Sequence, residues 1–483
     1  MLRRLLLWVL AVTGSIAVLP PADVLRAQDT PTERAAAKDV LRKMDALHQQ
    51  LDVPGVVARL SGTNAARDEV AARAKALMES ELLAMSDDIT RHPEVGWKEE
   101  RSVRLLAEYL RAHDFTVTVG VAGLSTAFVA TYNKGTPGPN LGVIVEYDAL
   151  RGTKGDFHGD QHSAQGPIGL AAAIATAEFL TRSKTPGTVT VYGTPAEEMM
   201  PPASKTQMFE AGVFKGADVI VRSHSSTATQ RPAPGFGTCC LNIDAVRYVF
   251  SGAPAHQMTP WDGRDALTAV IHLFNNIDAI RRTMRPEARI QGIITEGGKA
   301  PNVVPDRAVA EFYIRYPDEV YLTQVREMVD NAARAAALAT GTKVKIEGTM
   351  GARDGVSTSA LNELAFAYLK QYGGGKVREE PGKPQGYEET GSVSSAIPGV
   401  GFSAYSSTAT NHTYEMEADA LGPVGHAGFV VAAQAMSALL YDFATRADYR
   451  ALVKKEFDGT KALFGEYINA LGPAYPRPVV REP

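Results

Sequence analysis

The sequence predicts an α/β protein whose open, largely parallel sheet domain is interrupted by a smaller inserted α+β domain. Apolar strands and amphipathic helices alternate along most of the chain, which is typical of a parallel sheet covered by helices. The order of elements changes between residues 238 and 350 and then returns to the first pattern. In addition, 483 residues exceed what one ordinary hydrophobic core fills, so two domains are expected.

The chain starts with the pattern of a secretory signal peptide. Arg3 and Arg4 precede an apolar run from Leu5 to Leu19, and small residues around Ala27 offer a cleavage site. The run is shorter than a membrane-spanning helix requires, and an uncleaved anchor is the alternative. We therefore predict a signal peptide at 1–27 and an exported protein, periplasmic or secreted, with no stable membrane insertion after cleavage.

Residues 28–237 are predicted to form the first part of the α/β domain, preceded by a helical extension. Apolar residues recur at three- and four-residue intervals from Gln28 to about Met85, which indicates helices. Another amphipathic helix from Glu99 to His113 leads into the strands and helices of the sheet. The predicted strands are 115–119, 125–132, 141–147, 188–192 and 219–222, and the helices between them are 166–180 and 206–211.

Residues 238–350 are predicted to form the insert. The expected order is strand, helix, two strands, helix and strand, which is that of a ferredoxin-like split unit. These elements are 241–250, 265–284, 289–294, 309–316, 322–339 and 343–347. The adjacent Cys239 and Cys240 are expected to be two buried thiols.

The α/β pattern resumes after the insert. A strand is expected at 400–405 and a long helix at 424–445. We predict the second part of the α/β domain at 351–450 and a C-terminal tail at 451–483.

The composition excludes one class of partner. Charged residues make up 22% of the chain, the formal net charge is −4, and no basic stripe with interleaved aromatic residues occurs. Nucleic-acid binding depends on such a positive surface. We therefore predict no nucleic-acid partner.

Four short segments hold nearly all candidate metal ligands. Each follows an apolar strand, directly or after a loop, and the carboxyl ends of strands in an open α/β sheet form the rim where ligands bind. A single His or Glu in such a place is more often an ordinary polar residue, but the joint placement predicts one site. Carboxylates mixed with histidines suit zinc, with manganese or cobalt as substitutes. The segments are His158-Gly-Asp160-Gln-His162, Glu197-Glu198, Ser223-His224-Ser225 and Asn411-His412-Thr413.

Seven motifs between about Thr90 and Leu440 carry a family resemblance. They are His92-Pro-Glu-Val-Gly96, Gly120-Val-Ala-Gly-Leu124, Glu146-Tyr-Asp-Ala-Leu150, Gly193-Thr-Pro-Ala-Glu-Glu198, Ala255-His256, Gly292-Ile-Ile-Thr-Glu-Gly297 and Asn302-Val-Val-Pro305. With them the chain resembles the co-catalytic zinc aminoacylase and carboxypeptidase G metallopeptidase family. It is most similar to the amidohydrolase branch, which includes aminobenzoyl-glutamate hydrolases and auxin-conjugate hydrolases. In that family the inserted domain serves as lid and dimerisation domain, so the resemblance implies a homodimer.

The resemblance implies two divalent metal ions. Asp160 would bridge both, His162 and His224 would complete one site, and Glu198 and His412 the other. The branch motif reads His-Ala-Cys-Gly-His-Asn where this chain has His158-Gly-Asp-Gln-His-Ser163, so Asp160 stands in the place of the cysteine. A carboxylate in place of a thiolate widens the tolerance for manganese or cobalt beside zinc.

The resemblance also implies roles for residues that do not bind metal. Glu197 would be the general base, because a metal-bound water has a pKa of about 7 and can lose a proton to a nearby carboxylate. Asp148 would orient a histidine ligand. On the lid, His256 would stabilise the oxyanion in the partner subunit's site, and Asn302 and Arg315 would hold a substrate carboxylate.

The predicted function is therefore an exported metal-dependent amidohydrolase. Its small-molecule substrate would be an N-acyl amino acid or a dipeptide-like amide. A serine hydrolase is disfavoured because no Gly-x-Ser-x-Gly elbow occurs. The alternative that stays open is an exported substrate-binding protein with a vestigial or structural metal site.

Overall fold

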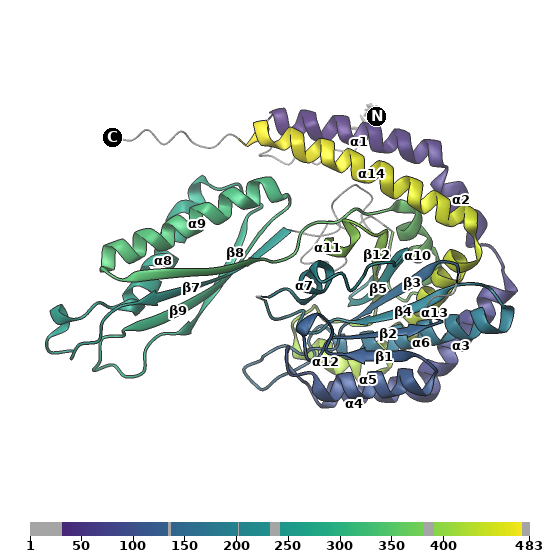
Figure 1. Cartoon of the computed structure of the whole chain (residues 1–483), viewed down its shortest axis with the longest axis horizontal. Coiled ribbons are helices and arrows are strands. Elements are labelled where there is room, and N and C mark those ends of the chain that lie inside the picture. The colour runs from purple at the N-terminus through teal and green to yellow at the C-terminus, as the bar shows by residue number, and fades with distance from the viewer. Residues whose placement is uncertain (1–30, 134–136, 201, 232–241, 380–390, 476–483) are drawn as a thin grey trace, which may run out of the picture.

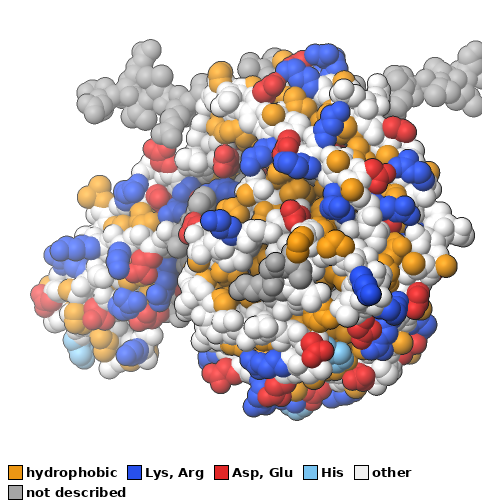
Figure 2. Space-filling model, turned by 45° about the vertical axis from the view of Figure 1, so that its right-hand side comes forward, with side chains coloured by type: hydrophobic (Ala, Val, Ile, Leu, Met, Phe, Trp, Pro, Cys, Tyr) orange, Lys and Arg blue, Asp and Glu red, His pale blue; other side chains and the backbone are white. Residues whose placement is uncertain are grey.

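The computed structural model describes residues 31–475 except 134–136, 201, 232–241 and 380–390. Two sheets organise the chain into a larger and a smaller domain (Figure 1). The predicted signal peptide, Cys239 and Cys240, and the predicted boundary at residue 238 lie outside the described residues. Figure 2 shows Lys and Arg side chains interspersed with Asp and Glu over the visible face.

The larger domain contains an eight-stranded sheet in the order β1-β2-β4-β3-β5-β12-β6-β11. The central strands β4, β3, β5 and β12 are parallel, whereas β1 and β2 run antiparallel at one side. Strands β3 and β4 are almost wholly buried, as expected where helices cover both faces. The strands are β1 (Thr116–Val119), β2 (Phe128–Tyr132), β3 (Asn140–Val145), β4 (Thr188–Gly193), β5 (Val219–Ser226), β6 (Thr229–Gln230), β11 (Val377–Arg378) and β12 (Gly399–Tyr405).

Two long helices, α6 (His162–Ser183) and α13 (Pro423–Thr445), pack together against the central strands and form much of the main core. Glycine lets α6 approach the sheet, because a Cβ on Gly169 would lie 2.3 Å from Val145 Cγ1. Among the described helices, α13 has the length and apolar composition to cross a membrane, but 78% of its most apolar window is buried in the protein. Burial of that extent is typical of a core helix.

The smaller domain is a four-stranded antiparallel sheet in the order β10-β7-β9-β8 with two helices on one face. This arrangement confirms the predicted ferredoxin-like insert in a largely parallel α/β domain. Its elements are β7 (Asn242–Ser251), α8 (Ala266–Ile280), β8 (Arg289–Glu296), β9 (Arg307–Tyr316), α9 (Glu319–Thr340) and β10 (Lys343–Met350).

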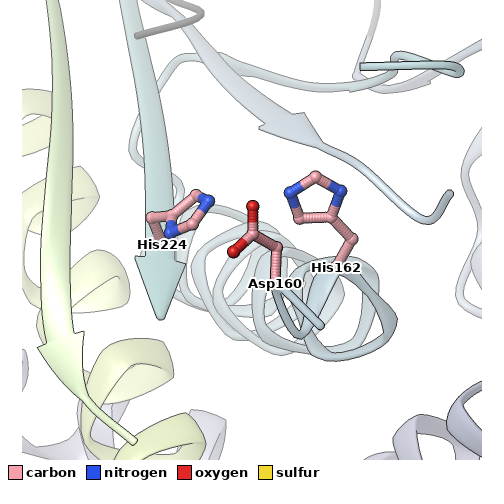
Figure 3. A group of neighbouring side chains, drawn as sticks. All are labelled: Asp160, His162 and His224. Carbon is pink, nitrogen blue, oxygen red and sulfur yellow. The ribbon is translucent and has the colours of Figure 1, made fainter. Parts of the chain in front are cut away.

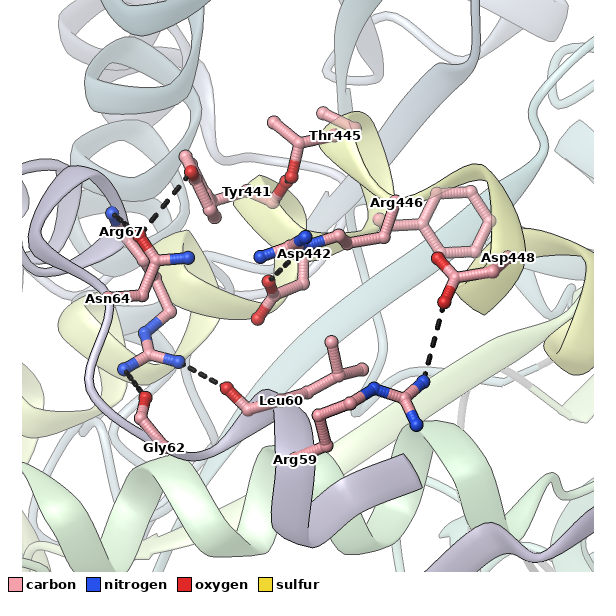
Figure 4. Close-up of polar contacts among 12 residues, drawn as sticks. Arg59, Leu60, Gly62, Asn64, Arg67, Tyr441, Asp442, Thr445, Arg446 and Asp448 are labelled. Carbon is pink, nitrogen blue, oxygen red and sulfur yellow. Dashed lines mark hydrogen bonds and ion pairs between the residues drawn. The ribbon is translucent and has the colours of Figure 1, made fainter. Parts of the chain in front are cut away.

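The N-terminal extension is helical, as predicted, and it packs on the larger domain. Arg67 is completely buried and its guanidinium donates to the carbonyls of Leu60 and Gly62, which closes the turn before α3 (Figure 4). Its helices are α1 (Pro31–Leu51), α2 (Val53–Leu60), α3 (Ala65–Leu77) and α4 (Leu83–Arg91), with a π-helical turn at Met78–Leu82. The amphipathic helix predicted after the extension is α5 (Glu100–Ala112).

The segment predicted as a C-terminal tail contains a long helix, α14 (Ala447–Ala474), which lies along α1 (Figure 1). Glu456 of α14 accepts hydrogen bonds from the backbone N–H groups of Ser359 and Ala360. Those groups lie at the buried amino end of α10 (Ser359–Gln371) in the larger domain. At the other end, the Tyr475 hydroxyl donates to Asp318 of the smaller domain at 2.8 Å. The helix therefore contacts both domains.

Candidate metal centre

The candidate ligands lie at one edge of the large sheet, where the parallel strands have their carboxyl ends. Asp160 and His162 follow β3 at the start of α6, and Glu198 follows β4. His412 lies between β12 and α12 (Tyr414–Ala420). His224 lies within β5 rather than after it, because β5 continues past the predicted end at Arg222 and pairs with β12 as far as Ser226. The sheet topology thus brings four distant segments together.

The structure brings the five ligand candidates together in two groups that share Asp160. Ligand atoms of Asp160, His162 and His224 all lie within 4.8 Å of one another, and the same holds for Asp160, Glu198 and His412. Figure 3 shows the Asp160 carboxylate between the rings of His162 and His224. A third group joins His162, Glu198 and Glu197, so the predicted base lies beside the ligands.

The three histidines present the same ring nitrogen to the centre. His162 Nδ1 is 3.1 Å from Asp148 Oδ1, and His224 Nδ1 is 2.9 Å from the Ser225 carbonyl oxygen. When each Nδ1 carries the proton, Nε2 is left as the lone-pair donor that a metal requires. His412 Nε2 already faces a carboxylate, 3.0 Å from Asp160 Oδ2.

Two buried ligand atoms have no hydrogen-bond partner among the described residues. They are His162 Nε2 and Glu198 Oε1. A buried polar atom without a partner is costly, so native proteins pair it with another group or with an ion. The donor set of carboxylates and imidazoles is one that zinc, manganese and cobalt all accept. The residues present therefore fit two divalent ions.

Burial and the crowding of negative charge shift the pKa values of the carboxyl groups in the centre. Burial raises the pKa of Glu197 to about 7. Burial, with the charges of Glu197 and Asp160, raises the pKa of Glu198 well above its ordinary value. Burial also opposes ionisation of Asp160, but the hydrogen bond from His412 and the nearby histidines hold its pKa well below the ordinary range. Cations bound here would favour the ionised form of all three.

Three residues of the ligand segments have left-handed backbone conformations that non-glycine residues rarely adopt. They are Gln161 (φ 56°), Ala196 (φ 53°) and His412 (φ 64°). The Ala196 turn places Glu197 and Glu198, and its N–H donates to Glu99 Oε1 at 2.7 Å. Glu99 is itself buried and also accepts from Thr126 at 2.8 Å. The sequence did not predict this role for Glu99, since nothing in it reveals the conformation of Ala196.

A buried network of charges lies beside the ring of His162. Glu146 Oε1 is 2.7 Å from Lys205 Nζ, and Glu146 Oε2 is 3.4 Å from Arg222 and 3.5 Å from His162 Nε2. Burial opposes ionisation of Glu146, but the two cations outweigh it and lower its pKa to about 2. Lys205 and Arg222 were not predicted as part of the site. One signal for Arg222 was available in the sequence, because a charged residue stands at the end of the otherwise apolar segment Val219–Arg222.

The lid residues are not brought to the metal centre of the same chain. His256 and Asn302 are exposed on neighbouring turns, joined by a bridge between His256 and Val303 and a 3.1 Å hydrogen bond from Gln257 to the Asn302 carbonyl. Among the described residues, no hydrogen bond or ion pair joins either side chain to a candidate ligand. Their predicted roles therefore require another position of the lid or another subunit.

Arg315 is better placed than the other two lid residues. It lies two residues from Tyr313 on β9, and alternate residues of a strand share a face. The Tyr313 hydroxyl is 2.9 Å from the backbone nitrogen of Met200 and donates to its carbonyl at 3.2 Å, just past Glu198. Burial and the charges of Glu197 and Glu198 raise the pKa of Tyr313. The Arg315 face of the lid sheet therefore turns toward the metal centre.

Two candidate ligand groups that share Asp160, on an α/β sheet with a ferredoxin-like insert, are an arrangement typical of two-metal hydrolases. Residues 241–340 match the peptidase dimerisation domain. The chain is 31% identical over 353 residues to the human Xaa-Arg dipeptidase, covering 69% of this chain and 78% of the relative. It is also 31% identical over 305 residues to one of the subunits of p-aminobenzoyl-glutamate hydrolase from Escherichia coli K12, covering 60% of this chain and 62% of that relative.

A solved structure shows the same fold. It is a dinuclear metal-binding peptidase of the M20 family from Bacillus subtilis, with a TM-score of 0.52 and 20% identity over 76% of this chain and 98% of that one. The chain belongs to the M20 family of metallopeptidases, as its motifs indicated. The protein is accordingly a metal-dependent hydrolase of amide or peptide bonds.

Proposed function

We propose that this protein hydrolyses the amide bond of a dipeptide or N-acyl amino acid, with Glu197 as general base. The observation that carries the proposal is the pair of three-residue ligand groups sharing Asp160, with Glu197 beside both His162 and Glu198. Asp160 is the member common to both groups and would bridge two ions. His162 and His224 would complete one site, and Glu198 and His412 the other.

The ions would supply the electrophilic chemistry, since bound divalent cations lower the pKa of water and polarise a carbonyl oxygen. Zinc is the first choice, and the carboxylate of Asp160 leaves manganese and cobalt as alternatives. Asp148 would keep His162 in the tautomer that presents Nε2, through the 3.1 Å contact to Nδ1.

Glu197 would move the proton. Burial raises the pKa of Glu197, whereas bound cations would lower it again, so its ionised carboxylate would be available to accept a proton. It would take one proton from the attacking water and return it to the nitrogen of the leaving amine. Glu198, its neighbour, would remain ionised as a ligand.

The lid would hold the substrate. The substrates named for both relatives, an Xaa-Arg dipeptide and p-aminobenzoyl-glutamate, carry an amino-acid carboxylate near the scissile amide. Arg315, on the face of β9 that turns toward the centre, could pair with such a carboxylate, with Asn302 as a further hydrogen-bonding group.

We also propose that the lid acts across a homodimer. The match to a peptidase dimerisation domain supports this, and so does β8, an edge strand with exposed Ile293 and Ile294. His256, exposed on its turn, would then complete the site of the other chain and stabilise the oxyanion there.

The test is a hydrolysis screen of dipeptides and N-acyl amino acids on chelated protein, with zinc, manganese or cobalt added back. Wild type should cleave members of the panel only when metal is present. Glu197→Gln should retain its ions and lose about 10²-fold or more in turnover. Glu210→Gln, an exposed change at the end of α7 (Ser204–Glu210), is the matched control.

Two results would contradict the proposal. Wild-type turnover in Glu197→Gln would exclude Glu197 as base. Tight binding of these amides without turnover by the metal-loaded wild type would favour the substrate-binding alternative.

Export is proposed from the sequence of residues 1–27 alone. Expression of the full chain should give mature protein shortened by about that segment, in the periplasm or the medium. Full-length protein retained in the cytoplasmic membrane would favour an uncleaved anchor instead.

A further inference from the structure

Gln161 lies between two proposed metal ligands in a conformation that favours glycine. Its backbone has φ 56° and ψ 29°, and its side chain is completely buried. The branch motif that the chain resembles has glycine at this position. A long polar side chain here therefore adds backbone strain, and the surrounding structure must hold it in place.

The Gln161 side chain joins two distant segments of the chain. Its Nε2 donates to the carbonyl oxygens of Met416 at 2.7 Å and Ser406 at 3.4 Å. Its Oε1 accepts from the Ser406 hydroxyl at 2.8 Å. Both protons of the amide and its oxygen thus have hydrogen-bond partners within the protein.

Ser406 and Met416 lie on either side of the ligand His412. Ser406 directly follows β12, and Met416 lies in α12, so the segment between them is an exposed loop closed at both ends by the Gln161 amide. The His412 side chain itself is 59% exposed and its backbone is left-handed. Few packing contacts can therefore fix its position from outside.

Other contacts also join these two segments, among them a hydrogen bond of 2.8 Å from the His158 N–H to the Glu417 carboxylate in α12. The His412 N–H donates to the Gly159 carbonyl at 2.9 Å, and Asn411 donates to the Asp160 carboxylate. Gln161 differs from these because its amide is completely buried and contacts both ends of the loop. It joins the Asp160–His162 segment to the His412 loop from within the core.

We infer that Gln161 is a positioning residue that sets the place of His412 relative to Asp160, and through it the affinity of the second metal site. The inference rests on the proposed metal function. It predicts that removing the amide weakens the ion held by Glu198 and His412 more than the ion held by His162 and His224. Supporting residues of this kind typically change metal affinity by about 10–100-fold.

The test compares glycine substitutions at the two ends of α6. Lys184 caps the carboxyl end with φ 55° and ψ 29°, nearly the conformation of Gln161, but it is exposed and far along the helix from the ligands. Gln161→Gly and Lys184→Gly relieve the same backbone strain. Only the first removes the link to Ser406 and Met416.

Chelated protein would be titrated with Co²⁺, with the visible absorbance of the bound ion and a competing chromophoric chelator as readouts. Wild type and Lys184→Gly should bind two ions per chain with the same pair of affinities. Gln161→Gly should bind the first ion as wild type does and the second about 10–100-fold more weakly. Ser406→Ala, which removes one of the three hydrogen bonds, should shift the second affinity in the same direction but less.

Melting of the chelated proteins controls for folding, and Ser406→Ala provides a milder variant if Gln161→Gly proves unstable. The inference would be overturned if folded Gln161→Gly bound both ions with the affinities of wild type. If only Ser406→Ala folds, the same result in that variant would overturn it. In either case the proposed function would stand. Equal weakening of both ions in Gln161→Gly would overturn it as well, since it would mark a general structural loss. No cobalt bound to wild type would overturn both proposals.

Discussion

The metal centre and the lid turns differ in how the chain holds their proposed functional residues. At the metal centre, four segments converge at strand ends, and buried side chains such as Gln161 and Glu99 link them from within. On the lid, His256 and Asn302 are exposed on turns with mostly local contacts. The difference indicates that one chain brings the candidate ligands together unaided, whereas the proposed roles of the lid turns require another surface.

The largest expected effect follows from loss of the ligand shared by both groups. Asp160→Ala should release both ions and reduce hydrolysis to background, because each group then keeps only two ligand side chains. Metal analysis after dialysis, alongside turnover, gives the measurement. Asp156→Ala, an exposed change in the preceding loop, is the control. Two tightly held ions in Asp160→Ala would show that Asp160 is not the shared ligand.

The variant His256→Ala tests the proposed role of the lid turns. Removing one oxyanion donor typically lowers turnover by about 10²–10³-fold, and the two ions should remain bound. If His256 serves the partner subunit, mixing His256→Ala with Glu197→Gln chains should restore activity, because one site of the mixed dimer has both groups. Mixed dimers that stay as inactive as the two parents would place His256 in the site of its own chain or outside catalysis.

Glu99→Ala tests whether buried support, and not only the ligands, determines the metal centre. Without the carboxylate, the Ala196 N–H loses its acceptor and the turn that carries Glu197 and Glu198 is free to relax. Turnover should fall about 10–100-fold with KM less affected. Glu99→Gln keeps a hydrogen-bond acceptor and should therefore retain part of the turnover that Glu99→Ala loses. Glu100→Ala, a change at the exposed neighbouring residue, should have no effect on turnover. Equal losses in the Gln and Ala variants would mean that the hydrogen bond is not what matters.

A buried carboxyl remote from the metal centre should affect stability alone. Burial raises the pKa of Asp442 from 3.8 to about 6, although the Tyr368 hydroxyl donates to it. The folded state then binds more protons than the unfolded state between these values, so the free energy of unfolding falls as pH rises through that window. Asp442→Asn should remove this component, a difference of up to about 3 kcal/mol between pH 4 and 7. Urea unfolding of both proteins across this range measures it. An unchanged pH dependence, or altered metal affinity, would contradict the assignment.

The sequence predicts the fold well because the patterns that indicate strands and helices lie within short segments of the chain. Alternating apolar segments predict the central strands and the order of the insert, and the family motifs identify the ligand segments. The end of β5 was placed too early because Ser223 to Ser226 are polar, and only their pairing with β12 makes them a strand. Helix α14 was missed because its partners, α1 and the lid, are distant in sequence.

The supporting residues of the site could not be predicted for a different reason. The roles of Gln161 and Glu99 depend on backbone angles at positions 161 and 196 and on contacts with residues up to 255 positions away. The charge network of Glu146 with Lys205 and Arg222 likewise depends on tertiary packing. A residue that acts through another residue leaves no signal of its own in a single sequence.

The most direct test of the account measures bound metal and amide hydrolysis in the same samples as ions are returned to the chelated protein. The account predicts no hydrolysis without metal, full activity on filling the sites, and two ions per chain at saturation. Full hydrolysis by protein from which all metal has been removed would contradict it.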